Sequence, residues 1–254
     1  MKVRVLGCGT SSGVPRIGND WGACDPLEPR NRRLRSAILI DSGDETMLVD
    51  CGPDLREQMN AADRDLVDRV IITHDHADHC HGIDDLRQLF HASGTPVAVY
   101  ARADVIERLR TRFAYAFGAN PLYPPIIETH PIEGDMAWGE GTLRFVDQPH
   151  GGMTSLGMRF DAGEKTFAYA IDFKDLTPDM ALMYEGADLW LCDCLRRRPH
   201  PTHAHLDAVL GWARDLRVGQ LLLTHLDNSM DYASLVAELP DWAAPAHDGQ
   251  EIIL

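Results

Sequence analysis

Residues 69–79 read RVIITHDHADH, a short apolar run followed at once by acidic and histidine side chains. The run at 70–73 is β-branched throughout, which predicts a short buried strand. Four potential metal ligands follow it directly, namely His74, His76, Asp78 and His79. In the turn after the strand the first two can share one ion, and the last two are offset towards a second. Imidazole and carboxylate together suit Zn, Fe or Mn rather than Ca or Mg.

Three further polar residues close apolar strands later in the chain, where they can complete such a site. His150 ends the run at 143–150, Asp172 ends the run at 165–172, and His225 ends the run at 220–225. A lone histidine at a strand end is more often a hydrogen-bonded structural residue than a ligand. Three such endings, taken with the first cluster, favour a shared metal centre over a histidine-rich surface loop.

This pattern resembles the metallo-β-lactamase-fold hydrolases. Their H-x-H-x-D-H motif is matched in full at 74–79, and their later His, Asp and His are matched in order. The resemblance implies that His74, His76 and His150 hold one metal, that Asp78, His79 and His225 hold the other, and that Asp172 bridges them. It spans nearly the whole chain and implies an α+β fold, a four-layer αββα sandwich.

Length and composition agree with one large domain, residues 1–254, because 254 residues with 44% hydrophobic content suffice for a sizeable core. Strands are expected at 3–6, 37–41, 46–50, 70–73, 97–100, 142–147, 155–160, 165–171, 188–193, 220–224 and 251–254. Helices are expected at 53–61, 83–92, 102–113, 175–184 and 204–215. No apolar stretch reaches membrane-spanning length, and the first residues indicate a strand rather than a signal peptide.

The six cysteines lack the regular spacing of a disulfide framework. We therefore expect reduced thiols and a cytoplasmic protein. Cys192 and Cys194 end an apolar run, so buried strand residues are favoured over a metal or redox pair.

Asp50 closes the strand expected at 46–50, as a strand-end aspartate does in the superfamily. Its expected role is to accept a ring N–H from a ligand histidine, which would set the tautomer of that ring. Capping of the following helix is the alternative, and the two roles are compatible.

Two cations a few ångströms apart would lower the pKa of a shared water and supply a hydroxide nucleophile. That chemistry serves esters, lactams and phosphodiesters alike, so the ligands alone do not select the substrate. Asp78 and His203 are the candidate catalytic residues. His203 lies 22 positions before His225 and can approach the metals as a general acid, with His205 as its competitor.

Two other segments point to phosphate. The turn GCGTSSGVP at 7–15 can offer backbone N–H groups to an anion, with Ser11 and Ser12 as candidate contacts, although any tight strand exit also needs glycine. Arg196 and Arg197 begin a basic triplet beside candidate site histidines, which suits a phosphate contact or a solvated surface turn.

With these features the chain is most similar to the PhnP-type cyclic phosphodiesterases and more distantly to tRNase Z. The narrower resemblance implies that His203 assists catalysis and that the substrate is phosphoribosyl 1,2-cyclic phosphate, opened to a monoester. The cofactors implied are two divalent ions, with Zn expected and Mn or Fe as alternatives.

One departure from that family concerns an extra structural zinc, which PhnP-type enzymes can bind through three cysteines and a later histidine. The corresponding segment here keeps only Cys24, and Asn228 stands where the histidine would be expected. A zinc ion needs about four ligands, so we expect no structural zinc. The segment 24–35 must be held another way, and its four arginines either face the substrate or pair with carboxylates.

The stretch 113–125 is rich in aromatic residues and proline, which suits a lid over the metals or, more simply, ordinary loop packing.

The net charge of −15 opposes nucleic-acid binding, so a tRNA nuclease is the weaker alternative to a small phosphorylated substrate. A thioester or lactam hydrolase leaves Arg196, Arg197 and His203 unexplained. A metal-binding protein without turnover is disfavoured by the complete ligand set. No membrane partner is expected, and a homodimer is an open alternative to a monomer.

Overall fold

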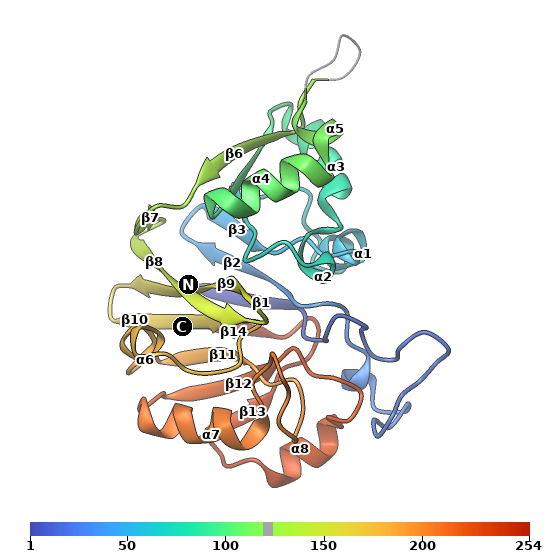
Figure 1. Cartoon of the computed structure of the whole chain (residues 1–254), viewed down its shortest axis with the longest axis vertical. Helices are drawn as coiled ribbons and strands as arrows, with labels where there is room; N and C mark the ends of the chain where they lie inside the picture. The colour runs from blue at the N-terminus through green and yellow to red at the C-terminus, as the bar shows by residue number, and fades with distance from the viewer. Residues whose placement is uncertain (119–123) are drawn as a thin grey trace.

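Two seven-stranded sheets pack face to face in the computed structural model, which describes residues 1–118 and 124–254 (Figure 1). The first sheet runs in the order β14 (Glu251–Ile253), β1 (Lys2–Gly7), β2 (Ala37–Ser42), β3 (Glu45–Val49), β4 (Arg69–Ile71), β5 (Val97–Ala101) and β6 (Ile127–Pro131). The second runs in the order β13 (Ala243–Pro245), β12 (Gln220–Thr224), β11 (Leu189–Asp193), β10 (Lys165–Ala170), β9 (Met153–Ala162), β8 (Gly141–His150) and β7 (Met136–Trp138).

Helices cover the outer face of each sheet (Figure 1). On the side of the first sheet lie α1 (Leu55–Ala61), α2 (Ala77–Cys80), α3 (Leu86–Ser93), α4 (Ala103–Arg112) and α5 (Ala114–Phe117). On the side of the second lie α6 (Pro178–Tyr184), α7 (Leu206–Asp215) and α8 (Tyr232–Glu238). The expected four-layer αββα sandwich is thus confirmed. Within the described residues, no helix is both long and apolar enough to cross a membrane.

Three separate apolar clusters hold the four layers together. One lies between the first sheet and its helices, one between the two sheets, and one between the second sheet and its helices. The sequence of strand β4 is apolar without alternation of polar and apolar residues, and its position in the sheet explains this. Val70 and Ile72 pack towards the helices, whereas Ile71 packs into the cluster between the sheets, so both faces of the strand are buried.

The structure contains the strands and helices expected from the sequence, with ends shifted by a few residues. It also contains β6, β7, β13, α2, α5 and α8, which the sequence pattern did not predict. Strands β7 and β13 are only three residues long, and α2 is a single turn inside the ligand motif. Such short elements depend on the surrounding tertiary structure more than on their own periodicity.

The segment 24–35 is held by a buried arginine. Arg33 is 2% exposed, and its guanidinium donates hydrogen bonds to the carbonyl oxygens of Asp227 (3.1 Å) and Met230 (2.6 Å) and to Oδ1 of Asn31 (3.1 Å). Its Nη1 also lies 3.8 Å from Sγ of Cys24. One side chain therefore connects this segment to the loop after β12.

The other three arginines of that segment lie nearer the surface. Arg30 pairs with Glu28 and Arg35 pairs with Asp54, while Arg32 lies over the ring of Trp21. Two of the four thus pair with carboxylates, which was one of the two roles expected for them.

Replacing Arg33 with methionine is expected to lower the free energy of unfolding by about 3 kcal/mol, because buried carbonyl oxygens lose charge-assisted hydrogen bonds. Urea unfolding of the two proteins measures the difference. Arg30→Met is the matched control, since it removes an exposed arginine of the same segment and should leave the midpoint nearly unchanged. Equal midpoints for Arg33→Met and the unmodified protein would contradict the assignment.

The aromatic stretch at 113–125 is only partly described. Phe113 and Phe117 pack against the apolar cluster beneath the helices of the first sheet, which is ordinary packing, and Tyr115 is 55% exposed. Pro121 and Tyr123, which the lid hypothesis also invoked, lie outside the described residues.

Candidate metal centre

Seven side chains from four strand ends converge where the two sheets meet. The loop and turn after β4 carry His74, His76, Asp78 and His79, while His150 ends β8, Asp172 follows β10, and His225 follows β12. All are buried except His76, which is exposed. The structure therefore brings together every residue that the sequence suggested as a ligand.

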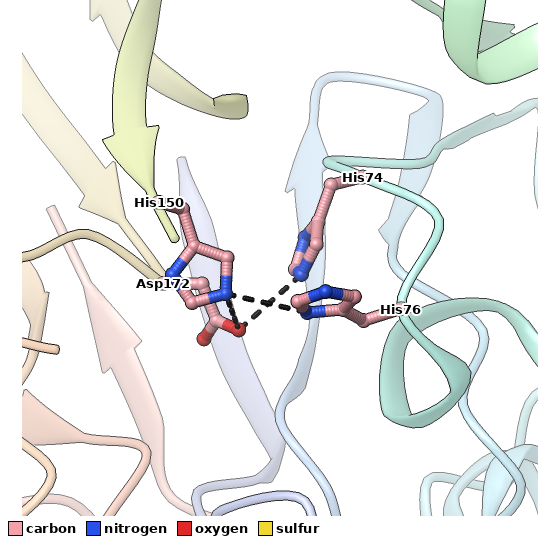
Figure 2. Close-up of side chains that lie close together, drawn as sticks. All are labelled: His74, His76, His150 and Asp172. Carbon is pink, nitrogen blue, oxygen red and sulfur yellow. Dashed lines mark hydrogen bonds and ion pairs between the residues drawn. The ribbon is translucent and has the colours of Figure 1, made fainter. Parts of the chain in front are cut away.

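Four of these side chains form a first group, which Figure 2 shows. Oδ2 of Asp172 lies 3.3 Å from Nε2 of His74 and 3.4 Å from Nε2 of His150. Nε2 of His150 lies 3.3 Å from Nδ1 of His76. Three imidazole nitrogens and one carboxylate oxygen therefore point at one small volume.

Asp78, His79 and His225 form a second group, two of whose members also contact Asp172. Nε2 of His79 lies 3.2 Å from Oδ2 of Asp78 and 3.4 Å from Oδ2 of Asp172. Nδ1 of His225 lies 3.3 Å from Oδ1 of Asp172. Asp172 thus stands between two groups of donors, which is the division that the family resemblance implies.

Hydrogen bonds on the far side of the rings orient two of these histidines. Oδ2 of Asp50 lies 2.7 Å from Nδ1 of His79, and the Asp50 carboxylate also accepts from the backbone and hydroxyl of Thr73. Nδ1 of His150 lies 3.1 Å from the carbonyl oxygen of Thr202. A proton held on Nδ1 leaves Nε2 with its lone pair towards the cluster. Asp50 is therefore placed for its expected role, while Asp54 is the N-cap residue of α1.

The donor set fits divalent metal ions. Nε2 of His74, Nε2 of His79 and Oδ1 of Asp172 are buried and have no hydrogen-bond partner among the residues that the structure describes, an arrangement that a cation would satisfy. Burial lowers the pKa of His150 to about 4, so its ring is neutral and can bind metal at neutral pH. Burial alone would raise the pKa of Asp172, but the surrounding histidines, above all His225 and His79, hold it well below its usual range.

The backbone at three of the strand ends is in the left-handed region that non-glycine residues rarely adopt. The φ angles are 66° at Asp50, 51° at Asp172 and 58° at His225. Such conformations cost on the order of 1–3 kcal/mol each and persist where the surrounding structure imposes them. Asp172 and His225 belong to the cluster and Asp50 contacts its member His79, which supports a functional role for the cluster.

His203 lies beside the cluster and has a partner that the sequence analysis missed. Its ring stacks on His225 at 5.0 Å between centroids, and its Nδ1 lies 2.9 Å from Oδ2 of the fully buried Asp193. Burial by itself would lower the pKa of His203, but attraction to Asp193 and their hydrogen bond raise it to about 9. Asp193 closes the apolar strand β11, and the same strand-end signal that singled out Asp172 was available for it.

Two arginines of α4 hold the loop that carries His74 and His76. Asp75, between His74 and His76, is held by Nε of Arg108 at 2.8 Å and by Nη2 of Arg112 at 2.9 Å. Nη1 of Arg112 also donates to the carbonyl oxygen of Asp75 at 2.5 Å. The two arginines lie one turn apart on α4, so that helix positions the loop that carries the first ligands.

Arg112→Ala is expected to weaken metal binding about 10–100-fold, the usual effect of removing a group that orients metal ligands. Arg112→Lys should not restore it, because one ammonium group cannot reproduce the two guanidinium contacts. Competition with a chelating dye measures the affinity. Arg110→Ala, an exposed arginine of the same helix, is the control, and equal affinities for the Arg112 and Arg110 variants would refute the role.

The residues proposed from sequence for substrate contact are not gathered at the cluster. Arg197 pairs with Glu238 of α8, and Arg196 donates to carbonyl oxygens of its own turn. His205 lies at the start of α7, and among the described histidines His203 is the one that approaches the ligands from this loop.

Among the described residues, neither Ser11 nor Ser12 forms a hydrogen bond with the cluster, although the turn that carries them does. From that turn, Oγ1 of Thr10 lies 3.4 Å from Nε2 of His225, a contact that the sequence analysis missed.

Comparison with known proteins agrees with this geometry. A profile of the beta-lactamase superfamily domain matches residues 45–226. The solved structure of a new diphosphatase from the PhnP family is 31% identical, with a TM-score of 0.90, over 99% of this chain and 96% of that chain. The short form of human tRNase Z has a TM-score of 0.69 over 100% of this chain and 99% of that chain, and its 16% identity shows the fold alone.

The octanoyltransferase of Porphyromonas gingivalis is 32% identical over an alignment of 266 positions, which covers 100% of this chain and 52% of that protein. The chain therefore spans about half the length of this curated relative. Since the profile covers most of the chain and the PhnP-family structure aligns over nearly all of it, the chain belongs to the beta-lactamase superfamily and, within it, to the PhnP family.

Proposed function

We propose that this hydrolase is a phosphodiesterase that opens a cyclic phosphate of a ribose phosphate or nucleotide, with His203 as the general acid. The observation that carries the proposal is the Asp193–His203 pair, which lies directly against the ligand cluster. Two divalent ions, Zn in the first instance, would be held by the two groups of ligands on either side of Asp172. When bound, they supply Lewis-acid activation of water and neutralise charge on the phosphate.

The Asp193–His203 pair matters because of the leaving group. Opening a cyclic phosphodiester expels a sugar alkoxide, a strong base that needs a proton in the transition state. Asp193 accepts a hydrogen bond from Nδ1–H of His203, so the ring is oriented and its Nε2–H is left for the leaving oxygen. Asp50 and Thr202 meanwhile keep the Nε2 atoms of His79 and His150 directed at the cluster.

A diphosphatase is the second candidate, because the PhnP-family relative of 31% identity carries that name. Hydrolysis of a diphosphate expels a phosphate, which is a much weaker base than an alkoxide. A positioned proton donor is then less necessary, so the Asp193–His203 pair favours the phosphodiesterase. The chain's net charge of −15 also favours a small substrate over RNA.

A substrate panel with the metal-loaded protein tests the proposal. It contains phosphoribosyl 1,2-cyclic phosphate, a 2′,3′-cyclic nucleotide, a nucleoside diphosphate, a precursor tRNA and a thioester. We expect hydrolysis of a cyclic phosphodiester. Cleavage of the diphosphate alone would select the second candidate, and cleavage of the thioester alone would reject both. The His76→Ala protein, purified in parallel, excludes a contaminating phosphatase.

A further inference from the structure

A cavity whose described wall residues include none of the metal-cluster side chains lies beside α1, between that helix and the dark blue loop that projects from the sheets in Figure 1. Its volume is about 520 Å³, within the range of small-molecule sites. Strand β1, the turn at 12–15, the segment 32–35, α1 and the residues 248–249 form its walls. Among the described residues that line it, none is one of the seven side chains of the metal cluster.

The walls of this cavity are basic, although the chain as a whole is acidic. Arg4, Arg32, Arg33 and Arg35 line it, against the carboxylates Glu57 and Asp248. Burial raises the pKa of Asp248 to about 7, which reduces its negative charge at neutral pH. Arg4 pairs with Glu251 and Arg35 pairs with Asp54, whereas Arg32 and Arg33 form no ion pair among the described residues, so these two supply most of the positive charge that would attract an anion to this position.

Several guanidinium donors in the walls are free for a ligand. Arg4 uses Nη1 on the carbonyl oxygen of Ala62, and Arg35 uses Nε on Ser11 and Nη1 on Asp54. Within the described part of the chain, no hydrogen bond uses Nη2 of Arg4, Nη2 of Arg35 or any side-chain N–H of Arg32. Guanidinium groups bind phosphate oxygens through such donors.

The turn that the sequence predicted to bind an anion contributes to this cavity. Ser12 lines it, and the Ser12 backbone N–H has no acceptor within residues 1–118 and 124–254. At the other end of the turn Thr10 contacts His225 of the metal cluster. The anion-binding prediction for 7–15 therefore fits this cavity better than the metal centre.

We propose that the cavity beside α1 is a separate binding site for a small phosphate ester, such as a pentose phosphate. Arg32, Arg35 and the Ser12 N–H receive the phosphate. The proposal concerns binding at a second site and does not depend on which bond the metal centre hydrolyses.

Calorimetric titration of the full-length, metal-loaded protein with ribose 5-phosphate tests the proposal. Arg32→Ala should weaken binding by at least about 10-fold, the value of one charge-assisted hydrogen bond. Arg30→Ala is the matched control, because Arg30 is an exposed neighbour that pairs with Glu28 and does not line the cavity. Ala61→Trp, which fills the cavity from α1, should also abolish binding. Both variants should still hydrolyse bis-p-nitrophenyl phosphate at the unmodified rate, which shows that they are folded.

The same titration of the His76→Ala protein separates the two sites. We expect it to bind ribose 5-phosphate as the unmodified protein does, because His76 does not line the cavity. Binding that requires His76 would place the ligand at the metal centre and overturn the proposal. Equal affinities for Arg32→Ala and Arg30→Ala, or no binding by the unmodified protein, would overturn it as well.

Discussion

The His76→Ala protein is expected to lose bound metal and to hydrolyse any substrate at least about 10³-fold more slowly, because the first group of ligands loses one of its three imidazoles. The other donors of that group face Asp172 from buried positions and cannot move outwards to replace it. Elemental analysis of protein purified without chelator measures the metal, and initial rates on bis-p-nitrophenyl phosphate measure turnover.

His91→Ala is the control for this loss, since it removes an exposed histidine of α3. It should retain metal and rate. A His76→Ala protein with full metal content would remove His76 from the ligand set. Added metal should also raise the unfolding temperature of the unmodified protein, and should do so much less for the variant.

His203→Ala is expected to keep its metal and to slow the opening of a cyclic phosphodiester by roughly 10²–10⁴-fold, the usual contribution of a positioned proton donor. The loss should be much smaller for bis-p-nitrophenyl phosphate, because p-nitrophenolate leaves without a proton. Comparing the two substrates under saturating metal therefore separates loss of the proton donor from damage to the metal centre. His205→Ala is the comparison variant, and a larger loss in it would transfer the role to His205.

The Asp193→Asn variant checks the same assignment through pH. The Asp193 charge raises the pKa of His203, so the folded protein keeps that ring protonated to a higher pH. Without the charge, His203 loses its proton at lower pH. The alkaline limb of the pH–rate profile should therefore shift to lower pH. If the alkaline limb stays at the same pH in the Asp193→Asn protein, the titration of a group other than His203 sets that limb.

The ligand positions could be predicted from sequence because polar residues at the ends of buried strands are conspicuous. The apolar run at 70–72 has no place for a polar side chain, and the polar residues Thr73 and His74 follow it directly. Asp172 and His225 end their strands in the same way. When strands of two packed sheets end at one edge, the packing of the sheets is enough to bring such residues together.

Contacts set by side-chain direction could not be predicted in this way. Arg197 is near His203 in sequence, yet it turns to Glu238, a residue 41 positions away. Arg112 reaches Asp75 across 37 positions. Neither partner is marked by periodicity, because a surface helix tolerates many charged residues and only packing decides which of them meet.

The sequence by itself determined the buried strands and the set of possible metal ligands, since hydrophobic periodicity and strand-end polarity are local properties of the chain, and the resemblance of its ligand motif to a known family implied the fold. Only the tertiary structure decided that Asp193 orients His203, that Arg33 holds the segment 24–35, and that Ser12 lines the cavity beside α1 instead of the metal centre. These are contacts between residues distant in sequence, and they depend on where each loop is placed once the sheets have packed.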